Sequence, residues 1–138
     1  MIYLDSSALM KLVRREDETA TLCDWLDLRR EQPVVTSELG RVEVLRAARR
    51  FGGQVLTEAR MVVGDLDLVP LDRAVQDVAC DIGDPLLRAL DALHLASALL
   101  IGEGLTAFVA YSHRLAGAAR TAGLVVATPG QVTPPEGC

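Results

Sequence analysis

The sequence predicts an α/β fold in which a central parallel sheet of four or five strands is flanked by helices. Short apolar runs alternate along the chain with longer stretches whose apolar residues recur at helical spacing, the pattern of parallel strands joined by helices. Half of the residues are hydrophobic (50%) but only 4% are aromatic, so Leu, Val and Ala must build the core. This composition favours helices packed on a sheet over an aromatic-rich sandwich.

Each apolar run is an expected strand, and the stretches between the runs are expected helices. The strands are expected at 2–4, 33–36, 106–111 and 124–127, with 68–71 as a shorter extended piece. The helices are expected from about Ser7, over 18–30, from Ser37 to about Gly52, and over 54–65, 72–82, 86–102 and 113–123. Serine can cap the first turn of a helix, and glycine commonly ends one. The stretch 86–102 is apolar almost all round, which predicts a buried helix.

Residues 1–129 are expected to form one domain, followed by a loose, Pro- and Gly-rich tail over 130–138. The three cysteines are widely spaced and form no C-x-x-C pair, which is typical of a reducing compartment. The first residues lack the pattern of a signal peptide, and charged residues interrupt the longest apolar region. We therefore expect a cytoplasmic protein with no membrane partner.

The net charge of −5 argues against a nucleic-acid partner, but the distribution of basic residues does not. Thirteen of the fourteen basic residues are arginines, and several are clustered: Arg14–Arg15, Arg29–Arg30, and Arg41, Arg46, Arg49 and Arg50. Arginine can bind a phosphate with two parallel hydrogen bonds, which lysine cannot do. The alternative, which charge alone favours, is that these arginines lie on solvated helix faces and pair with neighbouring acids.

Three carboxylates occupy positions where a charge is unexpected. Asp5 ends the first apolar run, Glu43 lies between two valines, and Asp91 lies inside the most apolar stretch of the chain. An ionised carboxylate that is buried without a partner is too costly to keep, so each needs a proton, a cation or a metal ion.

Two interpretations of these acids remain open. If the three converge, they repel one another unless a cation lies between them, and a few carboxylates with several waters are the usual ligands of Mg²⁺. A magnesium ion held in this way acts on phosphate esters. In the alternative, each acid pairs separately. Asp5 then pairs with a serine or a helix N-terminus, Glu43 with Arg46, and Asp91 with Arg88.

Four segments, in this order and at these intervals, carry a resemblance to a known family: "IYLDSSAL", "TSELGRVEVLRA", "LRALDALHLASAL" and "FVAYSHRLAGAARTAGLVV". They resemble a PIN domain, and more closely the VapC-type ribonuclease toxins of type II toxin–antitoxin pairs. The resemblance covers residues 1 to about 129, and "LDALHLASA" is its most specific part. It implies a PIN-like three-layer fold and a Mg²⁺- or Mn²⁺-dependent endoribonuclease. It also implies RNA as substrate, a VapB-like antitoxin as partner and a homodimer.

The resemblance assigns roles to particular residues. Asp5, Glu43 and Asp91 match the first three catalytic and metal-binding acids of the family, and Ser7 matches a hydroxyl that supports them. Ser112 stands where a fourth acid is expected. A serine brings no charge, so we expect weakened activity, or an inactive module that binds an antitoxin or RNA without cleaving it.

Further candidates lie close to these residues in the sequence. Arg41, Arg46 and Arg49 are expected to contact RNA phosphates beside the acidic site. His94 follows Asp91 by one helical turn and could hydrogen-bond it or contact the substrate. The sequence favours instead an interior histidine whose ring nitrogens are both satisfied.

Overall fold

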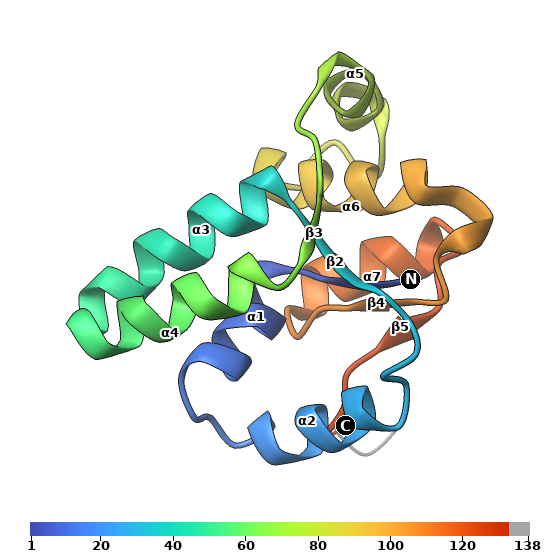
Figure 1. Ribbon diagram of the computed structural model, residues 1–138. Helices are drawn as coiled ribbons and strands as arrows, with labels where there is room; N and C mark the ends of the chain where they lie inside the picture. Colours follow the sequence, from blue (N-terminus) through green and yellow to red (C-terminus); the bar gives the residue numbers. More distant parts are fainter. Residues whose placement is uncertain (133–138) are drawn as a thin grey trace.

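In the computed structural model, which describes residues 1–132, five strands form one fully parallel sheet in the order β3-β2-β1-β4-β5 (Figure 1). The strands are β1 (Ile2–Leu4), β2 (Val34–Ser37), β3 (Asp67–Val69), β4 (Ala107–Val109) and β5 (Val126–Ala127). The predicted parallel sheet is confirmed, and the short run at 68–71 belongs to its edge strand. The central strand β1 pairs with β2 on one side and with β4 on the other.

Seven α-helices connect and cover the strands in the described part of the chain. They are α1 (Ser6–Val13), α2 (Thr19–Asp27), α3 (Glu38–Ala48), α4 (Gly53–Gly64), α5 (Arg73–Asp81), α6 (Ala89–Ile101) and α7 (His113–Thr121). Two short 3₁₀ turns, η1 (Arg49–Phe51) and η2 (Gly102–Gly104), follow α3 and α6. Every predicted helix is present, with ends displaced by a few residues. None of these helices is long and apolar enough to cross a membrane.

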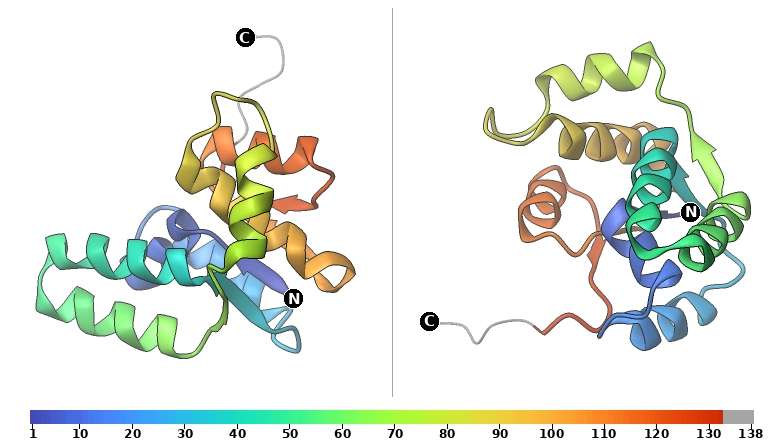
Figure 2. Two further views of the ribbon diagram at one scale, coloured as in Figure 1. Left: turned by 90° about the horizontal axis from the view of Figure 1, so that it is seen from above. Right: turned by 90° about the vertical axis from the view of Figure 1, so that its left-hand side faces the viewer.

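Alternate residues of the central strands divide the core into two halves, as the period of a strand requires. Ile2 and Leu4 of β1 face one side, where they pack with Val109 and with apolar residues of α1 to α4. Tyr3 faces the other side and packs with Phe108 and with residues of α6 and α7. The sheet is therefore covered on both faces, and α3 and α4 lie side by side and project beyond it (Figures 1 and 2).

The apolar helix α6 is less buried than its sequence predicts. It packs on the sheet with Leu95 and Ala98, while Leu90 and Leu100 are 51% and 48% exposed. α6 lies between the sheet and α5, and α5 covers only part of its outer side (Figure 1). The helix also starts at Ala89 rather than near 86. In the turn before it, Oδ1 of Asp84 accepts the amide proton of Leu86 at 2.8 Å.

The start of α1 also differs from the prediction. The helix begins at Ser6 and is capped by the carboxylate of Asp5, not by Ser7. The predicted cap at Ser37 is confirmed, because its hydroxyl accepts the amide proton of Gly40 at 3.0 Å.

The predicted tail starts in contact with the domain. The side-chain amide of Gln131 donates to the carbonyl of Tyr111 at 2.9 Å, and the hydroxyl of Tyr111 donates to the carbonyl of Pro129 at 2.8 Å. The rest of the predicted tail, 133–138, lies outside the described residues. Cys23 and Cys80 are free and exposed, and Cys138 also falls outside that range.

Candidate functional site

The carboxyl ends of the parallel strands bring the predicted acids to one edge of the sheet. Asp5 directly follows β1, and Ser112 lies three residues after β4, the neighbour of β1. Glu43 lies on α3, which leaves the end of β2, and Asp91 lies on α6. Ligands of open α/β sheets bind at this edge, so the fold places all four residues where a site is expected.

Asp5 is held by the turn that it caps. Its side chain is 4% exposed, and Oδ1 accepts hydrogen bonds from the amide of Ala8 at 2.9 Å and from the hydroxyl of Ser7 at 2.6 Å. The Ser7 oxygen also accepts the amide proton of Tyr111 at 3.0 Å, which ties the chain after β4 to Asp5. Burial raises the pKa of the Asp5 carboxyl above its ordinary value, and the two hydrogen bonds oppose that shift.

Glu43 has partners that the sequence did not indicate. Its Oε1 accepts hydrogen bonds from Nε2 of His94 at 2.5 Å and from the hydroxyl of Ser6 at 3.2 Å. The alternative pairing of Glu43 with Arg46 does not form. The carboxylate is therefore bound from two different helices rather than by an arginine of its own helix.

Asp91 likewise forms no ion pair with Arg88, its alternative partner. Separate pairing therefore holds for Asp5, which has its serine and its helix N-terminus, and is wrong for the other two acids.

His94 is buried, and both of its ring nitrogens have partners that the sequence did not identify. Its ring is 2% exposed, and Nδ1 lies 2.7 Å from the hydroxyl of Tyr3 while Nε2 contacts Glu43. The interpretation of an interior histidine with both nitrogens satisfied is confirmed, but the hydrogen bond to Asp91 is wrong. One signal was available: a tyrosine in the first strand and a histidine in an apolar helix both need buried partners.

An open pocket of about 850 Å³ lies beside these residues and brings three of the predicted side chains together. Its lining is formed by Glu43, Arg88, Ala89, Leu90, Asp91, Ser112, His113 and Arg114. Asp5 does not line the pocket. Ser112 is exposed there and caps α7, accepting the amide proton of Leu115 at 3.5 Å.

Asp5, Glu43 and Asp91 have the oxygen ligands that a hard cation prefers, but in this structure they lie too far apart to bind one ion together. Oδ2 of Asp5, Oε2 of Glu43 and both oxygens of Asp91 accept no hydrogen bond from the described residues, so each carboxylate has an oxygen available. Carboxylate oxygens are the ligands that Mg²⁺ prefers. In residues 1–132, however, no three His, Cys, Asp or Glu side chains lie close enough to hold one ion together. As they stand, the three carboxylates do not form a metal cage.

The three arginines predicted to contact phosphates do not line this pocket, and the arginines that do are Arg88 and Arg114. Arg41 and Arg46 on α3 and Arg49 in η1 are exposed. Within the described part of the chain, no arginine nitrogen lies within 4.0 Å of a carboxylate oxygen. These arginines therefore lie on solvated surfaces, as the alternative expects, but its pairing with neighbouring acids is wrong.

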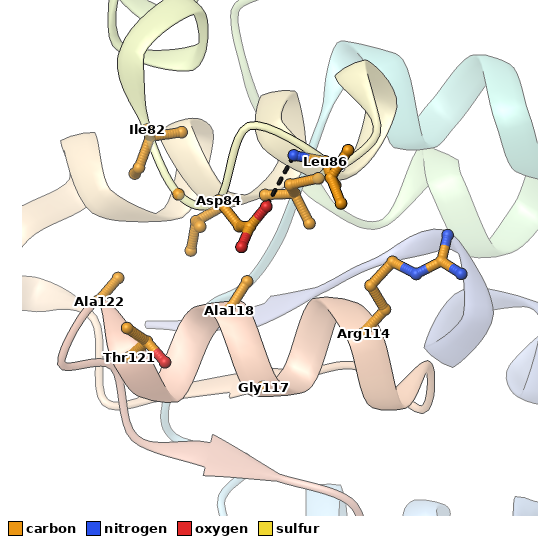
Figure 3. Close-up of a pocket in the computed structure, with 11 residues that line it drawn as sticks. Ile82, Asp84, Leu86, Arg114, Gly117, Ala118, Thr121 and Ala122 are labelled. Atoms are coloured by element: carbon orange, nitrogen blue, oxygen red, sulfur yellow. Dashed lines mark hydrogen bonds between the residues drawn. The ribbon is translucent and has the colours of Figure 1, made fainter.

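A second pocket of about 810 Å³ adjoins the first and shares Arg114 with it. It lies between the turn that precedes α6 and the outer face of α7, where Ala118 and Thr121 face the turn (Figure 3). The Leu86 side chain in this turn is 87% exposed, although the hydrogen bond from its amide to Asp84 holds the backbone (Figure 3). A largely apolar surface thus flanks the pocket that Glu43 and Asp91 line.

Comparisons with known proteins identify the family of this chain. The PIN domain family model matches residues 2–117. Ribonuclease VapC47 of Mycobacterium tuberculosis (strain CDC 1551 / Oshkosh) is 47% identical over 135 residues, which cover 96% of this chain and 99% of that protein.

Two solved structures share the fold. VapBC2 from Rickettsia felis, bound to a DNA fragment from its promoter, has a TM-score of 0.72 at 12% identity and covers 92% of this chain and 98% of its own. The sarcin-ricin loop cleaving toxin VapC20 of M. tuberculosis has a TM-score of 0.67 at 16% identity, with 91% and 97% covered. The chain therefore belongs to the PIN domain family, among the VapC-type ribonuclease toxins.

Proposed function

We propose that this protein is a metal-dependent endoribonuclease, the toxin of a toxin–antitoxin pair, and that it cuts RNA at the pocket lined by Glu43, Asp91 and Ser112. In this reaction, water attacks the phosphorus and the bond to the 3′ oxygen breaks. The products carry a 3′-hydroxyl and a 5′-phosphate. The observation that carries the proposal is that Glu43 and Asp91 line one pocket at the carboxyl edge of the parallel sheet, the edge at which Asp5 follows β1. Glu43 does not pair with Arg46, and Asp91 does not pair with Arg88, although each arginine is one helical turn away in sequence.

We propose Mg²⁺ as the cofactor, with Mn²⁺ as a substitute, and Asp5, Glu43 and Asp91 as its ligands. The support is the chemistry of the donors, since each carboxylate keeps an oxygen without a hydrogen bond. Binding requires the side chains to move closer together than they are in this structure. A bound ion would polarise the phosphoryl group and lower the pKa of a bound water.

The chain's own residues supply the surroundings of the reaction. Ser7 and the start of α1 fix the Asp5 carboxylate at the end of β1. Arg41, Arg46 and Arg49 are exposed and free of acidic partners in the described residues, so they can contact RNA phosphates. The excess of acids elsewhere explains why the net charge is negative although the substrate is an anion.

The partner in this proposal is a VapB-like antitoxin, which the VapBC2 complex supports by analogy of fold. A basic side chain of the antitoxin would enter the acidic pocket and compete with the cation for its carboxylates. Such a contact inhibits cleavage because it occupies the ligands that the cation needs.

The experiment that tests the function is cleavage of total RNA with mapping of 5′ ends, in Mg²⁺ or in a chelator. Asp5→Asn removes the charge but keeps the helix cap, because asparagine caps as well as aspartate. Asp72→Asn is the matched control, since Asp72 caps α5 in the same way, accepting the amide proton of Val75 at 3.1 Å. We expect metal-dependent cuts by the wild type and by Asp72→Asn, and none by Asp5→Asn. An Asp5→Asn protein that cuts as well as the wild type rejects the proposal.

A second candidate function is supported by one observation. Ser112 lines the pocket but carries no charge. In the described residues, Asp5, Glu43 and Asp91 do not lie close enough together to bind one metal ion. The protein could then be an inactive PIN module that binds an antitoxin or RNA without cleaving it. In that case the wild type binds RNA but leaves it intact in Mg²⁺ and in chelator alike.

A further inference from the structure

We propose that His94 is a positioning residue that holds the Glu43 carboxylate in the acidic pocket, and that Tyr3 fixes the His94 ring from behind. The inference rests on the proposed function, because Glu43 is one of the three carboxylates assigned there. It adds two buried side chains that do not reach the substrate but set the direction of a group that does.

The three side chains form a continuous chain of hydrogen bonds through the second half of the core. The hydroxyl of Tyr3 on β1 lies 2.7 Å from Nδ1 of His94 on α6, and Nε2 lies 2.5 Å from Oε1 of Glu43 on α3. An ionised carboxylate can only accept a hydrogen bond, so Nε2 carries the proton. Nδ1 is then free to accept the Tyr3 hydroxyl proton, which the hydroxyl retains because burial raises the pKa of Tyr3.

The surroundings leave the His94 ring little room to turn. Gly40 on α3 faces it, and a Cβ at that position would lie 3.4 Å from Cε1 of His94 and would collide with Oγ1 of Thr36. The His94 ring also meets the Tyr3 ring edge to face, with centroids 5.9 Å apart. The glycine therefore lets α3 approach closely enough for Glu43 to reach the ring.

Only one of the two carboxylate oxygens of Glu43 accepts hydrogen bonds from the described residues. Oε1 is bound by His94 and Ser6, while Oε2 has no hydrogen bond from the described residues and Glu43 lines the pocket. Groups that hydrogen-bond a ligating carboxylate from outside set its orientation, and their loss typically costs about 10- to 100-fold in metal affinity or activity.

Two substitutions separate the two hydrogen bonds of His94, one to Tyr3 and the other to Glu43. In His94→Gln, the amide nitrogen stands near the position of Nε2 and can still donate to Glu43. In His94→Asn, the shorter amide stands near Nδ1, so it keeps the Tyr3 contact and loses Glu43. We expect Mn²⁺ affinity, measured by electron paramagnetic resonance without RNA, to fall about 10- to 100-fold in His94→Asn and much less in His94→Gln. Cleavage should follow, through kcat rather than through KM for RNA.

A readout in the metal-free protein is independent of the cofactor. Nitrogen-15 spectra of the two histidine rings should show His94 protonated at Nε2 and not at Nδ1, with the exposed His113 as an internal reference. In Glu43→Ala the Nε2–H resonance should move. The opposite tautomer, or a resonance that Glu43→Ala leaves in place, overturns the inference.

The outcomes also separate the inference from the proposed function. If the wild type neither binds Mn²⁺ nor cuts RNA, the proposed function fails, and the ring spectra of the metal-free protein alone decide whether His94 holds Glu43. If the wild type does both and His94→Asn does both equally well, only the inference fails. Equal losses in His94→Asn and His94→Gln also overturn it, because they indicate general damage to the core.

Discussion

The hydroxyl of Ser7 connects two strand ends through one oxygen: it donates to Oδ1 of Asp5 at 2.6 Å and accepts the amide proton of Tyr111 at 3.0 Å. The carboxylate at the end of β1 is therefore fixed to the chain that leaves β4, its neighbour in the sheet. This contact explains why a small hydroxyl residue follows the first acid by two positions.

We expect Ser7→Ala to destabilise the protein by about 1 to 3 kcal/mol, because it leaves the buried amide of Tyr111 without a partner. Urea unfolding measures the change. The control is Thr57→Ala, since the exposed Thr57 hydroxyl donates only to the carbonyl of Gly53 in its own helix, and a surface change of that kind costs within about 0.5 kcal/mol. Equal stability of the two variants contradicts the assigned role of Ser7.

Asp5→Asn should raise stability at pH 7 in the metal-free protein. Burial raises the pKa of Asp5 above its ordinary value of 3.8, so the folded state binds a proton more tightly than the unfolded state. The wild type therefore loses stability as the pH rises from about that ordinary value through the raised one, and Asp5→Asn does not lose it. Thermal unfolding of both proteins in a chelator across this range tests the sign. A wild type that gains stability over Asp5→Asn as the pH rises contradicts the prediction.

Ser112→Asp should strengthen cation binding. An aspartate keeps the cap of α7 and adds a third carboxylate to the pocket that Glu43 and Asp91 line, so we expect Mn²⁺ affinity to rise roughly tenfold. Ser112→Asn keeps the cap without the charge and should bind Mn²⁺ as the wild type does. If Asp and Asn at this position give the same affinity, Ser112 does not stand at a cation site.

The predictable part of the fold and site follows from local patterns. Apolar runs alternating with helical spacing were enough to predict four or five strands and seven helices. Asp5, Glu43 and Asp91 were singled out because a charge is costly in an apolar context, but only Asp5 is buried, whereas Glu43 and Asp91 are partly exposed. The place of a site at the end of the first strand could be inferred because parallel strands all have their carboxyl ends at one edge of the sheet.

The unpredicted part depends on contacts between distant segments. Tyr3 and His94 are 91 residues apart, and the nearest acid to His94 in sequence, Asp91, is not its partner. The exposure of Leu90 and Leu100 depends on how much of α6 its neighbour α5 covers, which hydrophobic periodicity does not record.

Gly40→Ala tests the close approach of α3 to the His94 ring. The added methyl group collides with Oγ1 of Thr36, which is buried and donates to the carbonyl of Leu4 at 2.7 Å, so it cannot move aside without breaking that bond. We expect destabilisation of about 1 to 3 kcal/mol, as for other overpacked cores. Gly117→Ala is the control, because Gly117 is also helical but has no atom within 4 Å of an added Cβ. It should stabilise the protein by about 0.5 to 1 kcal/mol.

The exposed arginines near the site should determine how RNA binding depends on salt. Replacing Arg41, Arg46 or Arg49 with glutamine removes one phosphate contact, so each change should weaken binding of all RNAs similarly and reduce the salt slope by about 1. The experiment measures RNA affinity against salt concentration in the Asp5→Asn background, where the substrate stays intact.

Arg30→Gln is the matched control for this series. Arg30 is equally exposed but lies after α2 in a surface pocket that it shares with Asp24, Asp27 and Glu31, so its replacement should leave the slope unchanged. If Arg30→Gln lowers the slope as much as the three substitutions near Glu43, the RNA is bound by the overall charge of the protein. Arg41, Arg46 and Arg49 then do not form a specific phosphate-binding surface beside Glu43, and other residues must position the RNA at the pocket.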